Sequence, residues 1–100
     1  MSTKALKFLQ DQFGDLSFAD MLNSLRTTDE VTQVDLAEAV GISKGLVCDI
    51  EKGRRLPTIE QAKVMAEYLG YLVEGFVSIL IQDQLRKANL YMKVSVEKAS

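Results

Sequence analysis

The sequence predicts an all-α fold of about five to six helices, with a possible short β-strand near the C-terminal end. Two observations support this prediction. Apolar residues recur at helical spacing along most of the chain, and the segments that carry them are bounded by serine, threonine or glycine. One hundred residues, of which 26 per cent are charged and only one is proline, are expected to form one compact folded domain.

The helices outside the centre of the chain follow the same pattern of cap, apolar stripe and stop. They are expected at residues 3–13 before Gly14, after Ser17, at residues 59–69 between Thr58 and Gly70, and at residues 73–88.

The central segment, residues 31–57, has the most specific pattern. Thr32 is a suitable N-cap, and an acidic residue follows at capping-box spacing. Gly41 can adopt the left-handed conformation that ends a helix, Ser43 can cap the next one, and Gly53 stops it. The order is helix, glycine turn, helix, basic loop, which is the spacing of a DNA-binding helix-turn-helix.

In such a motif the second helix enters the major groove, and its N-terminal residues contact base edges. Lys44 can donate to guanine, and Leu46 can pack on a thymine methyl group. Gln33, at the start of the first helix, is placed to contact a phosphate or to brace the second helix. The predicted DNA-binding residues are Gln33, Ser43, Lys44, Gly45, Leu46, Asp49, Lys52, Arg54 and Arg55.

Residues 18–70 resemble the lambda-repressor-like (Xre-type) helix-turn-helix family. The resemblance rests on Thr32-Gln33, Leu36-Ala37, Gly41-Ile42-Ser43, Ile50-Glu51-Lys52-Gly53, Pro57 and the helix end from Ala66 to Gly70. It implies a bundle of about five helices, usually a homodimer, that binds double-stranded operator DNA, and a partly buried ion pair between Arg26 and Glu51. Gly45 and Asp49 stand where many relatives carry polar or basic side chains, so the operator sequence cannot be carried over.

The segment CDIEKGRR and the sequence from residue 67 onward resemble small HigA-type antitoxins of toxin–antitoxin operons. That resemblance implies an autoregulating repressor that also neutralises a small basic ribonuclease toxin. Two alternatives stay open at this point. One is a stand-alone or phage-type Xre regulator without a toxin partner, and the other is an interaction module that has lost operator binding.

Three parts of the chain are expected: an N-terminal helical extension (1–17), the helix-turn-helix domain (18–70), and a C-terminal helix with a tail (71–100). The apolar stripe of the last helix is wider than one buried face requires, which indicates contact with a second copy. The tail alternates apolar and polar residues, as a strand does, and would pair with its twin, join a partner's sheet or fray. The predicted dimer or partner contacts are Phe76, Ile79, Leu80, Tyr91 and Lys93.

Charge and composition exclude several classes of function. The net charge is −2, yet Lys44 to Arg55 holds four basic and two acidic side chains, a local strip suited to DNA. With no histidine and one cysteine, Cys48, we expect no enzyme activity, no metal site and no cofactor. The single cysteine fits a reducing cytoplasm, and no segment is long and apolar enough for a membrane span.

Overall fold

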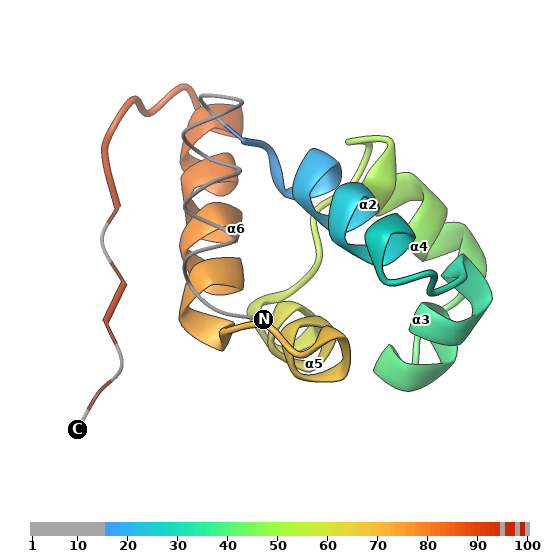
Figure 1. Ribbon diagram of the computed structural model, residues 1–100. Helices are drawn as coiled ribbons and strands as arrows, with labels where there is room; N and C mark the ends of the chain where they lie inside the picture. The colour runs from blue at the N-terminus through green and yellow to red at the C-terminus, as the bar shows by residue number, and fades with distance from the viewer. Residues whose placement is uncertain (1–15, 95, 98, 100) are drawn as a thin grey trace.

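The computed structural model describes residues 16–94, 96, 97 and 99, and this part of the chain is all-helical, as predicted. Figure 1 shows α6 on one side of the bundle, the segment from α2 to α4 on the other, and α5 crossing beneath. The predicted helix over residues 3–13 lies outside the described residues. The five helices are α2 (Phe18–Thr28), α3 (Gln33–Val40), α4 (Lys44–Glu51), α5 (Ile59–Leu69) and α6 (Val73–Lys87).

Four helices begin at the hydroxyl caps that the sequence indicates. The side-chain oxygens of Ser17, Thr32, Ser43 and Thr58 each accept a hydrogen bond from the backbone N–H three residues later, at 3.0–3.1 Å. Thr58 also completes a full capping box, because the side chain of Gln61 accepts from the Thr58 N–H at 2.9 Å. Each cap contributes about 1 kcal/mol to the stability of its helix.

The helix ends use the left-handed conformation, with and without glycine. Gly41 and Gly70 have φ of 79° and 81° and end α3 and α5, as predicted. Glu30 and Asn89 have φ of 57° and 59° and follow α2 and α6. The residue after each of these four donates back to the helix, as in the Leu90 N–H bond to the Leu85 carbonyl at 2.8 Å. Gly53, with φ of 75°, follows α4 in the same way, and the Arg54 N–H donates to the Asp49 carbonyl, so this turn geometry occurs at the ends of all five described helices.

The hydrophobic core joins α6 to the rest of the bundle. Phe76 is fully buried, meets Phe18 edge to face with ring centroids 5.8 Å apart, and stacks on Tyr71 at 6.1 Å. The other large, fully buried side chains are Met21, Leu22, Leu36, Val47, Ile50, Met65 and Leu80. Because these residues come from all five described helices, the helix-turn-helix and α6 share one core.

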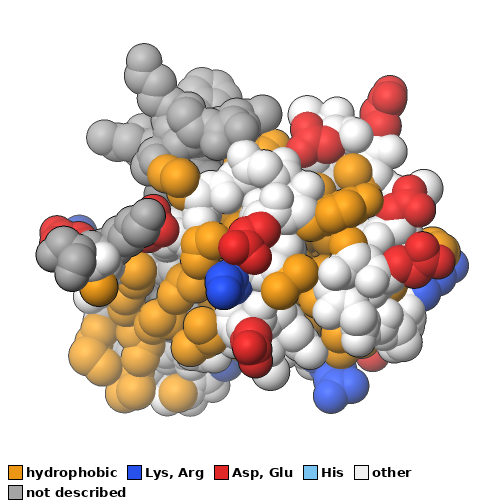
Figure 2. Space-filling model, turned by 90° about the horizontal axis from the view of Figure 1, so that it is seen from below, with side chains coloured by type: hydrophobic (Ala, Val, Ile, Leu, Met, Phe, Trp, Pro, Cys, Tyr) orange, Lys and Arg blue, Asp and Glu red, His pale blue; other side chains and the backbone are white. Residues whose placement is uncertain are grey.

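Three of the predicted dimer contacts belong to this core, and that prediction is corrected. Phe76, Ile79 and Leu80 are 0, 2 and 0% exposed within the single chain. The wide apolar stripe of α6 has an internal explanation, because α6 packs against both α2 and α5. The exposed apolar surface is made instead by residues such as Tyr68 and Leu72, 47 and 40% exposed. Figure 2 shows hydrophobic side chains gathered on the side of the molecule where α6 lies.

A buried carboxylate fixes α6 against the start of α2. Asp83 is 8% exposed, and its Oδ2 accepts from the Phe18 N–H at 2.9 Å. Its Oδ1 accepts from Arg86 Nη2 at 2.7 Å, and the same nitrogen donates to the Leu16 carbonyl at 3.3 Å. A carboxylate is favourable at a helix N-terminus, where N–H groups lack intrahelical partners. Asp83 therefore acts as a cap for a helix 65 residues away in sequence.

The described residues after Asn89 turn back beside α6, and Figure 1 shows them running toward the start of that helix. The predicted strand has no partner strand among residues 16–94. None of the described helices is long and apolar enough to cross a membrane.

Candidate nucleic-acid interface

The turn between α3 and α4 sets the angle at which α4 is presented. Gly41 ends α3, and the Ile42 N–H donates to the Ala37 carbonyl at 3.0 Å, which closes the turn. Ser43 then begins α4. Val47 and Ile50 anchor α4 in the core at 0 and 1% exposure, so the opposite side of this helix faces solvent.

The N-terminal half of α4 offers an open surface for a duplex. Lys44 and Gly45 are both exposed. A Cβ built on Gly45 would meet nothing closer than the Ser43 side-chain oxygen, at 3.8 Å. The absence of a side chain at position 45 is therefore not required by packing within the chain. It does allow another molecule to approach the backbone of α4 closely.

Two other predicted contact residues are partly occupied within the chain. Ser43 Oγ accepts from the Leu46 N–H at 3.0 Å and keeps its hydroxyl hydrogen for a ligand. Leu46 is half-buried and packs against the core, so only part of its side chain can reach a thymine methyl group. Among the predicted base-contacting residues, Lys44 has the greatest freedom to reach a base edge.

Asp49 faces the basic loop after α4. Its carboxylate lies 3.5 Å from the Arg54 guanidinium, and the two side chains are 36 and 66% exposed. The Asp49 carbonyl also accepts from the backbone N–H groups of Arg54 and Arg55, at 2.9 and 3.4 Å. The loop is thus held beside the helix, and Arg54 offsets the negative charge that Asp49 would otherwise present to phosphates.

The basic surface contains one lysine that the sequence did not suggest. Lys52, Arg54 and Arg55 are exposed on the loop, as expected. Lys87, at the end of α6, donates from Nζ to the Gly53 carbonyl at 3.1 Å. This bond adds a fourth positive charge to the loop from a residue more than thirty positions away. A basic residue at a helix end is common, so position alone gave no sign of this proximity.

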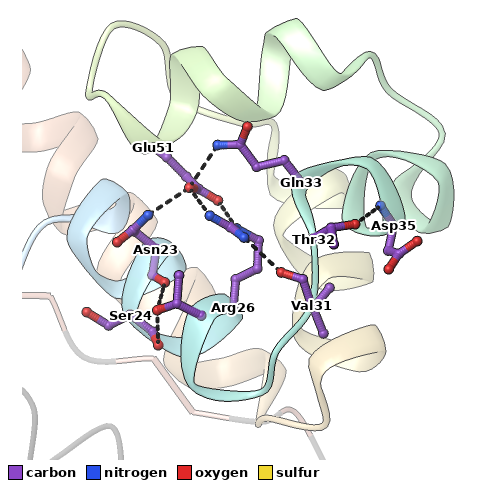
Figure 3. A network of polar contacts seen from close by, with 9 residues as sticks. Asn23, Ser24, Arg26, Val31, Thr32, Gln33, Asp35 and Glu51 are labelled. Carbon is purple, nitrogen blue, oxygen red and sulfur yellow. Dashed lines mark hydrogen bonds and ion pairs between the residues drawn. The ribbon is translucent and has the colours of Figure 1, made fainter.

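A polar network around Glu51 fixes α4 to α2 and α3, as Figure 3 shows. Arg26 donates to the Glu51 carboxylate from Nε at 2.6 Å and from Nη2 at 2.9 Å. Asn23 and Gln33 donate to the same carboxylate, at 2.9 and 3.2 Å. The Arg26–Glu51 ion pair that the family resemblance implied is therefore present. Gln33 braces α4 through Glu51, which is one of the two roles expected for it. Its contact with a phosphate stays a prediction.

The network also sets the charge state of its members. Burial alone would raise the pKa of Glu51, but the hydrogen bonds from Arg26, Asn23 and Gln33, with the charge of Arg26, leave it below its usual value. The hydrogen bond to Glu51 raises the pKa of Arg26, against the opposing effect of burial. Both groups are therefore charged at neutral pH, and the ion pair is maintained.

The predicted contacts in the tail lie away from this surface. Tyr91 is 83% exposed and Lys93 is also exposed, both beyond the C-terminal end of α6. Figure 1 shows the tail on the side of the bundle opposite α3 and α4. The structure thus brings together Ser43, Lys44, Gly45 and the basic loop, and it separates them from Tyr91 and Lys93.

A short helix ended by glycine, a capped second helix with an open face, and a basic loop together define a helix-turn-helix protein. A helix-turn-helix family model (HTH_3) matches residues 22–76, more than half of the chain. The chain therefore belongs to this lambda-repressor-like helix-turn-helix family and is a DNA-binding transcription regulator. No curated protein and no solved structure matches the chain.

Proposed function

We propose that the protein is a sequence-specific repressor that binds a two-fold symmetric operator as a homodimer, and that it is the autoregulating antitoxin of a type II toxin–antitoxin operon. The single observation that carries the DNA-binding part is the solvent-facing N-terminal half of α4, which is free of intrachain packing at Lys44 and Gly45. Lys44 supplies base contacts in the major groove, while Gly45 lets the helix lie close to the base pairs.

The basic loop supplies the sequence-independent part of the affinity. Lys52, Arg54, Arg55 and Lys87 neutralise phosphates on either side of the groove and fix the register of α4. Each neutralised phosphate releases counterions, so binding weakens as salt rises. Four such side chains in each protomer give about eight phosphate contacts in a dimer and a slope of log K against log[salt] of about −7.

The homodimer is supported by the apolar surface on the α6 side. Tyr68 and Leu72, just before α6 in the sequence, are exposed, and Val73, Val77 and Ile81 are half-buried along α6. Exposed apolar patches of this kind mark association surfaces in proteins. A dimer through this side leaves α4 of each copy free to face DNA, and the two-fold symmetry of such a dimer requires a palindromic operator.

The antitoxin role is supported by the resemblance to HigA-type proteins and by exposed acidic residues on the first two described helices. Five acidic side chains are exposed on α2, α3 and the loop between them: Asp20, Asp29, Glu30, Asp35 and Glu38. A surface of this charge complements a basic ribonuclease and speeds its capture. A stand-alone or phage-type regulator with no toxin partner is the second candidate, since the match to the family covers the DNA-binding domain alone.

Operator binding is tested by fluorescence anisotropy on DNA from upstream of the protein's own gene, with competitor DNA, at about 50 and 200 mM salt. The proposal expects a specific complex at nanomolar protein, within the usual range for specific sites, with the steep salt slope given above. Binding that is no tighter than binding to competitor DNA at both salt concentrations would contradict autoregulation.

The antitoxin role is tested by co-expression with the product of the adjacent reading frame. The proposal expects a stable complex that restores growth, and it expects Asp35→Lys with Glu38→Lys to weaken that complex. Glu60→Lys, a charge reversal on the exposed side of α5, is the matched control and should leave the complex unchanged. An adjacent product that neither arrests growth nor binds would favour the stand-alone regulator.

A further inference from the structure

One edge of the C-terminal tail is held by a single side chain of α6. The Gln82 amide donates from Nε2 to the Met92 carbonyl at 2.5 Å, and its Oε1 accepts from the Val94 N–H at 3.2 Å. These two backbone groups flank Lys93. A side-chain amide that bonds to both in this way replaces the C=O and N–H of a neighbouring strand, so the tail is held as a strand would be in a sheet.

The opposite edge of the tail, at Lys93, has no backbone hydrogen-bond partner among the residues that the structure describes. In extended backbone, successive residues direct their polar groups to alternate sides. If the groups on either side of Lys93 face Gln82, the N–H and C=O of Lys93 itself face away from α6. Neither Tyr91 nor Lys93 makes a backbone hydrogen bond within the described chain, and Tyr91 is 83% exposed. An unpaired edge of this kind is a template for another strand.

The sequence at this edge is complementary to itself. Residues 93–97 read Lys-Val-Ser-Val-Glu. When two copies run antiparallel about an axis through the middle of this segment, Lys93 of each lies opposite Glu97 of the other, and Val94 lies opposite Val96. Oppositely charged cross-strand pairs are favourable and like-charged pairs are not. Sliding one copy by four residues in either direction would place Lys93 opposite Lys93, or Glu97 opposite Glu97.

The register also agrees with the open edge. In any extended strand, residues four positions apart, such as 93 and 97 in the proposed pairing, direct their backbone groups to the same side. Both are exposed, whereas Val94 and Val96 are half-buried. Lys93, whose backbone groups point away from Gln82, is therefore one of the residues that this register requires to form cross-strand hydrogen bonds.

We propose that the C-terminal segment pairs antiparallel with the same segment of a second copy, in the register that places Lys93 opposite Glu97. This inference rests on the proposed homodimer and deepens it, because it names the strand that joins the two protomers and the charges that select its register. The occupant of the open edge is a second copy, since the charge pattern is complementary to itself.

Charge exchange tests the register without disturbing the folded core. Lys93→Glu alone places glutamates opposite one another at both ends of the ladder, and Glu97→Lys alone does the same with lysines. Each single variant should weaken the dimer roughly five- to a hundredfold in sedimentation equilibrium at low salt. The double variant should restore it. An equimolar mixture of the two single variants should form a heterodimer, because both pairs are then opposite in charge.

The outcomes separate this inference from the proposed homodimer. Dimers that form equally well in the wild type, both single variants and the mixture would overturn strand pairing while leaving dimerisation through the α6 side intact. A wild-type chain that stays monomeric even on operator DNA would overturn both. Single variants that lose binding to the adjacent gene's product while dimerising normally would assign the edge to that partner and refute self-pairing.

Discussion

Glu51→Gln is the change that most directly tests how α4 is held in place. Glu51 is the last residue of α4, and its carboxylate accepts hydrogen bonds from α2 and from the start of α3. Its side chain is 3% exposed and that of Arg26 is 12% exposed. Glutamine has the same size as glutamate but carries no charge. It also has a single accepting oxygen, whereas the donors around Glu51 bond to two carboxylate oxygens in the wild type.

The expected cost follows from burial. Removing one partner of a buried ion pair costs about 3–5 kcal/mol, because the remaining charge is left uncompensated. Glutamine retains part of the hydrogen bonding, so we expect the lower end, about 3 kcal/mol in the free energy of unfolding. Domains of this size have about 5–15 kcal/mol in total. The loss corresponds to a fall in Tm of about 12–24 °C.

The assay is urea and thermal unfolding followed by circular dichroism, with Asp49→Asn as the matched control. Asp49 is in the same helix and forms an ion pair too, but its pair with Arg54 spans 3.5 Å between side chains that are 36 and 66% exposed. Such pairs contribute at most about 1 kcal/mol. If Glu51→Gln costs no more than Asp49→Asn, the assignment of a structural role to the buried network is wrong.

The same carboxylate predicts a pH dependence. The pKa of Glu51 in the folded chain lies below its usual value of 4.5, despite burial, because of its three donors and the charge of Arg26. A lowered pKa contributes stability that is complete above the unfolded-state pKa and is lost as pH falls through the folded-state pKa. Wild-type stability should therefore fall below pH 4.5, and the difference between wild type and Glu51→Gln should narrow over the same range.

Three further predictions concern single residues. Glu30→Gly should raise the free energy of unfolding by up to about 1 kcal/mol, because residue 30 has positive φ. Glu38→Gly, within α3, is the control and should lower the free energy of unfolding by about 1 kcal/mol. Equal effects of the two substitutions in urea unfolding would argue against the turn geometry at residue 30. Phe76→Ala should cost about 3–5 kcal/mol in the same assay, and a cost under about 1 kcal/mol would contradict its place in the core. Lys87→Ala should leave stability within about 0.5 kcal/mol and reduce the salt slope of operator binding by about 2 per dimer; an unchanged slope would remove Lys87 from the interface.

Local chemistry explains what could be predicted of the fold. Hydroxyl caps such as Ser43 and turn glycines such as Gly41 interact with residues only three or four positions away. Both partners of each interaction can therefore be read from a short stretch of sequence. Turns at Glu30 and Asn89 were not anticipated, because nonglycine residues adopt positive φ only when the surrounding packing compensates the strain. The cap that Asp83 provides to α2 depends on tertiary contact and leaves no local pattern.

The candidate site shows the same division. The exposed side of α4 followed from helical periodicity, and the ion pair between Arg26 and Glu51 followed from family resemblance. The proximity of Lys87 to the loop, and the partial burial of Leu46, depend on how α6 and the core are packed. The misplaced contact surface on α6 has the same origin, since a wide apolar stripe does not reveal whether one chain or two bury it.

The central claim is that the N-terminal half of α4 contacts bases, and the most direct test is the affinity of Lys44→Ala for the upstream DNA at fixed salt. Lys63→Ala removes the same charge from the exposed side of α5 and serves as the control. With both variants folded by circular dichroism, we predict that Lys44→Ala loses about 1–3 kcal/mol of specific binding while Lys63→Ala binds like the wild type. Equal affinity of the two variants would contradict the assignment of α4 as the helix that recognises DNA.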